Sequence, residues 1–200
     1  MINQHYELVL DDIKNIEGVI YYRIRATQDF MCNRLVVLKG ALGGYITDTA
    51  TLSVNSWVDE RSFIGIKTKI DNNTYIGVFT KIGNNVIIGK LCCIESNSTI
   101  GDNVLIGDMT SIESFGHIKH GATIGNGVNI NHRIYIDANV EIGDYVNIGM
   151  YVKIYGDTKI SNNVLIGSNV EIGHGSTLGG YINIGNKSKI YKDTTITLNT

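Results

Sequence analysis

The feature that most constrains this chain is an aliphatic residue at every sixth position, unbroken from Ile46 to Ile196. A six-residue spacing does not fit the 3.6-residue turn of an α-helix, so a helix could not keep these residues on one face. In a strand, alternate side chains point to the same side, so the residue two positions earlier shares the interior. That position is small or β-branched: Ser62, Thr68, Thr74, Thr80, Val86, Cys92, Ser98 and Val104.

The remaining positions of each six-residue unit are predicted to form the corners between successive strands. Glycine is most frequent one residue after the aliphatic position, and asparagine is favoured three residues after it. Both tolerate the left-handed backbone conformation that a tight corner needs. Three units would close one triangular coil, and successive coils would stack roughly 4.8 Å apart by parallel hydrogen bonding. The sequence therefore predicts an all-β fold, a three-sided parallel β-helix with coils of about 18 residues, roughly 40 Å long by that spacing.

Residues 1–44 lack the repeat. Segments 6–10 and 18–27 are predicted to form two strands around a polar turn, with a further strand at 34–38. The end of a solenoid exposes apolar side chains and unpaired backbone, so a cap is expected there. We therefore predict a β-hairpin cap over residues 1–44 and a β-helix over 45–200.

Composition narrows the possible partners. The formal charge is −2 and the lysines are scattered, so no basic stripe indicates a nucleic-acid partner. No apolar run approaches the ~18 residues that span a bilayer, and no basic-then-apolar signal pattern opens the chain. We expect a cytoplasmic protein with no membrane partner. Three cysteines, two of them adjacent, indicate neither a disulfide framework nor a metal site.

The typical unit has an aliphatic residue, a glycine, two variable residues, a small residue and a further variable residue. Over about three quarters of the chain, this pattern resembles the hexapeptide-repeat acyltransferases. Segments 22–30, 43–46 and 56–59 are similar to the start of the YdcK-like transferases. The resemblance implies a left-handed, single-stranded β-helix and an activity in acyl transfer. It also implies acyl-CoA, such as acetyl-CoA, as a co-substrate, no permanently bound cofactor, and assembly into a parallel homotrimer.

Within that family, Ile130, Asn131 and His132, followed by Ile136, resemble the step that carries the catalytic histidine of acyl-ACP and sugar N-acyltransferases. The resemblance implies that His132 is the general base, because histidine titrates near neutrality. Asn131 could stabilise the oxyanion, and Glu113, diagonal to His132 in stacked coils, could orient the imidazole. Those enzymes often place an acid directly after the histidine, where this chain has Arg133.

Residues one coil apart fall into columns along the prism. One column contains three glycines beyond Asn131, namely Gly149, Gly167 and Gly185. A groove without side chains could hold the extended pantetheine arm of acyl-CoA, although glycine is also the commonest residue at this repeat position. The lysines toward the same end could bind the CoA phosphates as point charges: Lys153, Lys187 and Lys189.

Another column carries outward aromatic residues, Phe79, Phe115 and Tyr151, beside Met150. A narrow prism has no interior for them, so they indicate an interface between subunits. Cyclic assembly is common, and a homotrimer is expected.

Two functions fit these patterns. The first is transfer of an acyl group, in the first place acetyl, to a hydroxyl or amine of a small molecule or sugar. The alternative is a non-catalytic β-solenoid with a structural or binding role, which the unbroken register and the missing acid after His132 favour. A zinc-dependent carbonic anhydrase is disfavoured because His117 and His120 are three residues apart, whereas that class uses a wider step.

Overall fold

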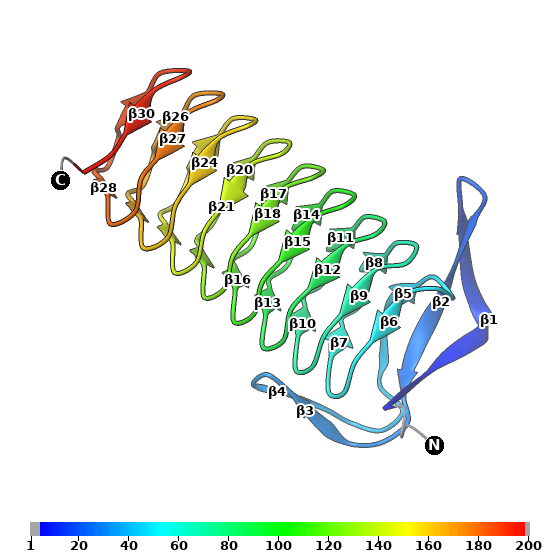
Figure 1. Ribbon diagram of the computed structural model, residues 1–200. Helices are drawn as coiled ribbons and strands as arrows, with labels where there is room; N and C mark the ends of the chain where they lie inside the picture. The colour runs from blue at the N-terminus through cyan, green and yellow to red at the C-terminus, as the bar shows by residue number, and fades with distance from the viewer. Residues whose placement is uncertain (1–4, 199–200) are drawn as a thin grey trace.

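The computed structural model describes residues 5–198, and these form a three-sided, left-handed parallel β-helix with a β cap at its N-terminal end (Figure 1). The ends of the two predicted domains, residues 1–4 and 199–200, lie outside the described residues. Each coil contributes one short strand to each of three sheets. Residues 5–198 contain no helical segment with the length and hydropathy needed to cross a lipid bilayer.

The first sheet is formed by every third strand, starting at the cap. Its solenoid strands are β5 (Leu42–Ile46), β8 (Phe63–Ile64), β11 (Lys81–Ile82), β14 (Thr99–Ile100), β17 (His117–Ile118), β20 (Tyr135–Ile136), β23 (Lys153–Ile154), β26 (Glu171–Ile172) and β29 (Lys189–Ile190). Neighbouring strands pair in parallel with an offset of one coil, as His117 does with Tyr135. The predicted stacking is therefore confirmed.

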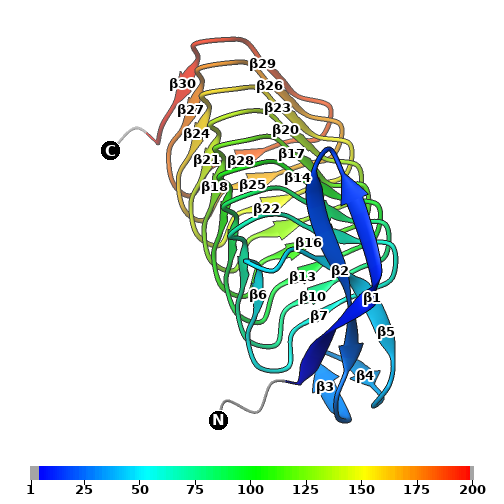
Figure 2. The same ribbon diagram turned by 90° about the vertical axis from the view of Figure 1, so that its right-hand side faces the viewer.

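The other two sheets repeat the same offset (Figure 2). The second sheet contains β6 (Thr51–Leu52), β9 (Lys69–Ile70), β12 (Ile87–Ile88), β15 (Leu105–Ile106), β18 (Thr123–Ile124), β21 (Glu141–Ile142), β24 (Lys159–Ile160), β27 (Thr177–Leu178) and β30 (Thr195–Ile196). The third sheet contains β7 (Trp57–Val58), β10 (Tyr75–Ile76), β13 (Cys93–Ile94), β16 (Ser111–Ile112), β19 (Asn129–Ile130), β22 (Asn147–Ile148), β25 (Leu165–Ile166) and β28 (Asn183–Ile184).

The interior is built from the two positions that the sequence predicted. Ile88 and Ile106 are buried in successive coils, and the small residues two positions before the aliphatic ones are buried with them. Their hydroxyl groups are satisfied between coils. Thr74 Oγ1, for example, donates to the carbonyl of Gly89 at 2.7 Å and accepts the N–H of Cys92 at 3.1 Å. Buried polar groups need such partners, so the threonines stabilise the stack.

The corners take the left-handed conformation whether or not the residue favours it. Asn73 and Asn85 have φ near 55°, as predicted, but Leu91 and Phe115 have φ values of 59° and 65° at the same repeat position. This conformation costs a non-glycine residue roughly 1–2 kcal/mol. The corner N–H of Leu91 donates to the carbonyl of Asn72 in the preceding coil at 2.9 Å, so stacking holds the corner in place.

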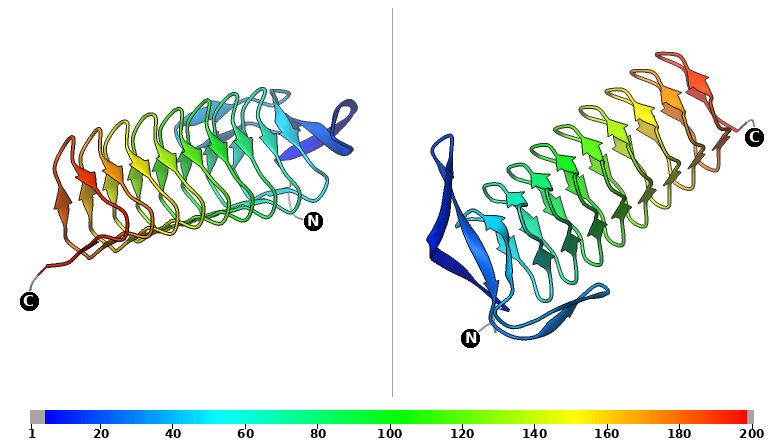
Figure 3. Two further views of the ribbon diagram at one scale, coloured as in Figure 1. Left: turned by 90° about the horizontal axis from the view of Figure 1, so that it is seen from above. Right: turned by 180° about the vertical axis from the view of Figure 1, so that it is seen from behind.

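The cap consists of two hairpins (Figures 1 and 3). Strands β1 (Tyr6–Ile16) and β2 (Val19–Ala26) pair antiparallel, and β2 pairs with β5, so this hairpin extends the first sheet. The first strand is longer than the predicted 6–10. Strands β3 (Phe30–Cys32) and β4 (Leu35–Val37) form the second hairpin, which lies beside the third sheet.

His5 anchors the cap to the first coils. Its imidazole is 2% exposed, its Nε2 lies 2.7 Å from the carbonyl oxygen of Ser56, and its ring meets the ring of Phe30 edge-on. Burial lowers the pKa of His5, although the bond to Ser56 acts in the opposite direction. A depressed histidine pKa means that the neutral form stabilises the fold above the ordinary pKa of about 6.5, and that this contribution is lost as pH falls.

We therefore expect the free energy of unfolding to decrease as pH is lowered from 7.5 toward 5.5. Urea unfolding at several pH values measures this. The His5→Asn variant should be less stable at pH 7.5 and should lose much of the pH dependence over this interval. An unchanged pH dependence in that variant would show that other groups cause the effect.

Candidate functional site

His132 lies at the corner that joins β19 to β20, between the third sheet and the first. We call residues 131–133 the His132 corner. The His132 side chain is half exposed, and its Nε2 lies 3.1 Å from Oε2 of Glu113, which belongs to the corner of the preceding coil. The structure thus brings together the two residues that the sequence placed diagonally across adjacent coils.

Arg133 directly follows His132, at the position where the enzymes that this corner resembles often have an acid. Its guanidinium carbon lies 5.6 Å from the ring centres of both Phe115 and Tyr151, one coil on either side. Both rings are half exposed, and Met150 beside them is 43% exposed. A guanidinium between aromatic faces is held by cation–π attraction. The edge next to His132 is therefore an ordered ladder of aromatic and cationic side chains.

Asn131 contacts the next coil. Its Nδ2 donates to the carbonyl oxygen of Ile148 at 2.8 Å. This bond fixes the side chain against the solenoid and leaves the second Nδ2 hydrogen available, since an amide nitrogen carries two.

The glycine column beyond Asn131 has a structural cause. A Cβ atom on Gly149 would lie 2.7 Å from the backbone nitrogen of Ser168, and one on Gly167 would lie 2.7 Å from that of Asn186. The side-chain oxygens above these glycines accept backbone N–H groups: Ser168 Oγ accepts from Met150 at 3.1 Å. Where an open groove was predicted, side-chain oxygens of the following coils lie close over Gly149 and Gly167.

These contacts predict opposite outcomes at two glycines of one column. Gly167→Ala should lower the free energy of unfolding by about 1–3 kcal/mol, because overpacking displaces the next coil. Gly185→Ala should change it little, since its nearest atom would be Ser188 Oγ at 3.9 Å. Urea unfolding of both variants checks this, and equal stability of the two would contradict the stacking role.

The lysines predicted to meet CoA phosphates are partly neutralised. Lys153 and Lys189 lie on either side of Glu171, with Nζ 3.8 Å and 3.6 Å from its carboxylate oxygens. Lys187 stands at a corner with φ of 62°. The structure brings these side chains to the same end of the prism as Gly167 and Gly185, but more than one coil beyond His132.

The other surface histidines differ from His132. His174 pairs with Asp157, with Nε2 and Oδ2 3.0 Å apart, at the corner that follows the first sheet. His117 stacks on Tyr135, with ring centroids 6.2 Å apart. Among residues 5–198, no three His, Cys, Asp or Glu side chains come together in a way that could hold a metal ion.

A hollow of about 590 Å³ lies between the β3–β4 hairpin and the third sheet. Arg34 of the hairpin and Cys93, Glu95 and Ser111 of the solenoid line it. Ser111 is two residues before Glu113, so the hollow and the His132 corner lie about one coil apart. Sequence reasoning missed it, because the repeat does not reveal where the second hairpin lies. Burial raises the pKa of the Cys93 thiol to about 12, and the Glu95 carboxylate adds to this, so Cys93 is a poor nucleophile there.

The repeat itself matches a known family model. Residues 67–102 and 79–114 match the model described as bacterial transferase hexapeptide (six repeats). None of the curated proteins compared with the chain matches it in sequence. Residues 67–114 thus carry the hexapeptide repeat of that model, and the fold is the left-handed β-helix.

Solved structures share this fold. The UDP-N-acetylglucosamine acyltransferase of Francisella novicida superposes with a TM-score of 0.61 at 21% identity, over 72% of this chain and 60% of that protein. The UDP-N-acetylglucosamine acyltransferase of Bacteroides fragilis superposes with a TM-score of 0.54 at 20% identity, over 72% of this chain and 64% of that protein. The chain therefore spans less than two thirds of either enzyme, and the likeness is one of fold.

Proposed function

We propose that the protein is an acyltransferase that moves an acyl group, in the first place acetyl, from acyl-CoA to a hydroxyl or amine of a small molecule or sugar. The observation that carries the proposal is the His132–Glu113 pair at an exposed corner of a hexapeptide solenoid. The acyltransferase activity of the two proteins with the same fold adds support.

The pair suits general base catalysis. If Nε2 donates to Glu113, the lone pair of the neutral ring is on Nδ1. Nδ1 takes the proton of the acceptor hydroxyl or amine while the oxygen or nitrogen attacks the thioester carbon. The tetrahedral intermediate then expels the CoA thiolate, which takes the proton back from His132. The free Nδ2 hydrogen of Asn131 could stabilise the oxyanion.

The proposal includes a homotrimer. The ladder of Phe115, Arg133 and Tyr151 leaves two half-exposed aromatic rings beside His132, and a neighbouring subunit would cover them. A second subunit would also exclude water from the His132 corner and so strengthen its electrostatic interactions. Light scattering coupled to size-exclusion chromatography should give the mass of three chains, and a monomer at micromolar concentration would contradict this part.

The hollow beneath the β3–β4 hairpin is a suitable entry for the acceptor. Arg34 and Glu95 place one cation and one anion on its walls, and Ser111 adds a hydroxyl close to Glu113. No loop between repeats is needed to cover an acceptor bound there, because the cap hairpin lies over the third sheet.

Thermal unfolding with and without acetyl-CoA tests the proposed function. A ligand that binds the native state raises the melting temperature by mass action, so millimolar acetyl-CoA should raise it by several degrees. No shift with acetyl-CoA or CoA would favour the alternative, a non-catalytic solenoid. The contacts above Gly149 and Gly167 support that alternative, since they explain the glycine column without a ligand.

A further inference from the structure

A second hollow lies where the β1–β2 hairpin leans over the first sheet. Its volume is about 500 Å³. The hairpin contributes Ile16 and Tyr21, and the sheet contributes side chains from four successive coils: Phe63, Lys81, Thr99, His117 and Lys119. We call it the hairpin hollow. It faces the first sheet, whereas the hollow near Ser111 faces the third.

The two lysines that line the hairpin hollow make no ion pair within residues 5–198. In the described part of the chain, lysine ion pairs are made by Lys90, Lys153, Lys159 and Lys189. Lys81 and Lys119 make none. The one carboxylate that lines the hollow, Asp102, uses Oδ1 to accept the backbone N–H of Asn84 at 2.6 Å. His117 and His120 complete the polar lining.

One end of the hairpin hollow is aromatic. Phe63 stacks on Tyr45 of the preceding coil, with centroids 5.3 Å apart and planes 11° apart. Tyr21 meets Phe63 edge-on at 5.5 Å. Tyr45 covers one face of the Phe63 ring. The opposite face is therefore directed toward the next coil, where Lys81 pairs with Phe63. The hollow thus offers an aromatic surface and two lysine ammonium groups to one ligand.

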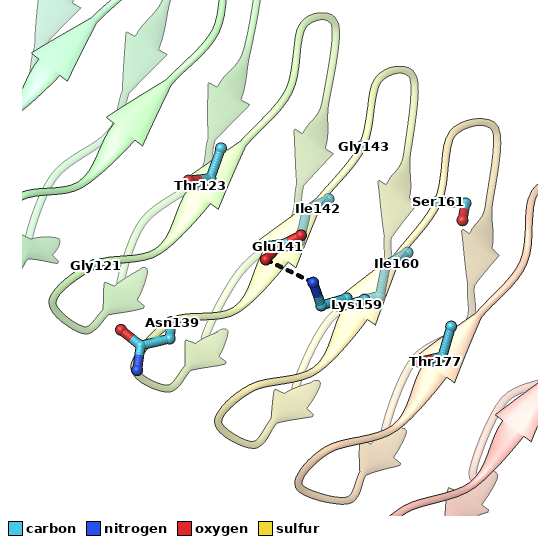
Figure 4. A pocket seen from close by; sticks show the side chains of 10 residues that line it. All are labelled: Gly121, Thr123, Asn139, Glu141, Ile142, Gly143, Lys159, Ile160, Ser161 and Thr177. Carbon is cyan, nitrogen blue, oxygen red and sulfur yellow. Dashed lines mark ion pairs between the residues drawn. The ribbon is translucent and has the colours of Figure 1, made fainter.

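The hollow on the second sheet lacks this combination. It measures about 520 Å³, and Figure 4 shows Glu141 and Lys159 facing each other across it. Their Nζ and Oε1 atoms are 3.0 Å apart, so the charges neutralise each other, and no aromatic residue lines it. Two lysines without ion pairs among the described residues, beside an aromatic end, therefore distinguish the hairpin hollow from the hollow on the second sheet.

We propose that the hairpin hollow binds a nucleoside diphosphate or triphosphate. The flat base stacks on Phe63 against Tyr21, and the phosphates lie against Lys81 and Lys119. The same chemistry could come from a free nucleotide or from the nucleotide portion of a larger molecule such as CoA. The proposal does not depend on catalysis at His132, because it concerns binding alone.

Calorimetric titration of the 200-residue chain with ADP tests the proposal. Wild-type protein should bind ADP, and the double variant Lys81→Glu, Lys119→Glu should bind it at least about tenfold more weakly, because each lost phosphate contact is charge-assisted. Lys159→Glu is the matched control and should bind like wild type. A double Lys→Gln variant should also bind more weakly, and it keeps the test valid if the charge reversal impairs folding.

Two further titrations separate the parts of the ligand. Tyr21→Ser should weaken ADP but leave inorganic pyrophosphate unchanged, since the tyrosine contacts the base. If CoA binding is lost in the lysine variants, the nucleotide portion of CoA is the ligand of the hairpin hollow. If CoA binding survives, CoA binds elsewhere and the ligand of the hairpin hollow is a free nucleotide. The proposal is overturned if ADP does not bind, if the lysine variants bind it as wild type does, or if pyrophosphate binds as tightly as ADP.

Discussion

His132→Ala is expected to reduce the rate of acyl transfer by about 10²- to 10⁴-fold, the usual contribution of a positioned general base. The side chain is half exposed, so the melting temperature should stay close to that of the wild type. Glu113→Gln should reduce the rate less, because it keeps a hydrogen-bond acceptor but removes the charge that orients the imidazole. Release of the CoA thiol, measured with a panel of hydroxyl and amine acceptors, gives the rates.

The chain offers a matched control for this variant. His174 occupies the same repeat position as His132 and also contacts a carboxylate of the preceding coil, with Asp157 Oδ2 at 3.0 Å, but it lies at a different corner. His174→Ala should therefore leave the rate unchanged. Equal activity of the wild type and His132→Ala would exclude His132 as the base, and equal losses in both variants would indicate a general effect on the protein.

Ile88→Ala is expected to destabilise the protein by about 2–5 kcal/mol, the range for truncating a fully buried isoleucine. Ile88 is 0% exposed and stacks between Ile70 and Ile106, so the vacated space has no solvent to fill it. The neighbouring Ile87 of the same strand is 49% exposed. Ile87→Ala should cost less than about 1 kcal/mol.

Urea unfolding of the two variants gives both values. They differ by one position in one strand, so amino-acid type, coil and sheet are held constant. Similar losses in both would contradict the inward direction of the sixth position, and with it the stacking of the coils.

The solenoid could be predicted from the sequence because each unit repeats one local rule. Alternation in a strand fixes the side that Ile88 and Thr74 face, and the six-residue spacing fixes where the chain turns. The corners could be located but not fully explained. Leu91 and Phe115 take a conformation that the sequence assigns to asparagine and glycine, because hydrogen bonds from adjacent coils hold it.

The candidate site, like the solenoid, could be predicted only in part from the sequence. The contact between His132 and Glu113 follows from the offset of one coil, so the columns alone predicted it. The role of Gly149 could not be predicted, because it depends on how closely the backbone and side chain of Ser168 in the next coil approach it. The two hollows beside the cap depend on the path of residues 5–44, which follow no repeat. The likeness of segments 22–30, 43–46 and 56–59 to YdcK-like transferases stays a prediction.

The most direct test of catalysis at the His132 corner is a crystal structure with acetyl-CoA bound. The proposed function predicts the thioester beside His132, with its carbonyl carbon placed so that an acceptor within hydrogen-bond reach of Nδ1 can attack it. A thioester bound several coils from His132, with that corner empty, would contradict it.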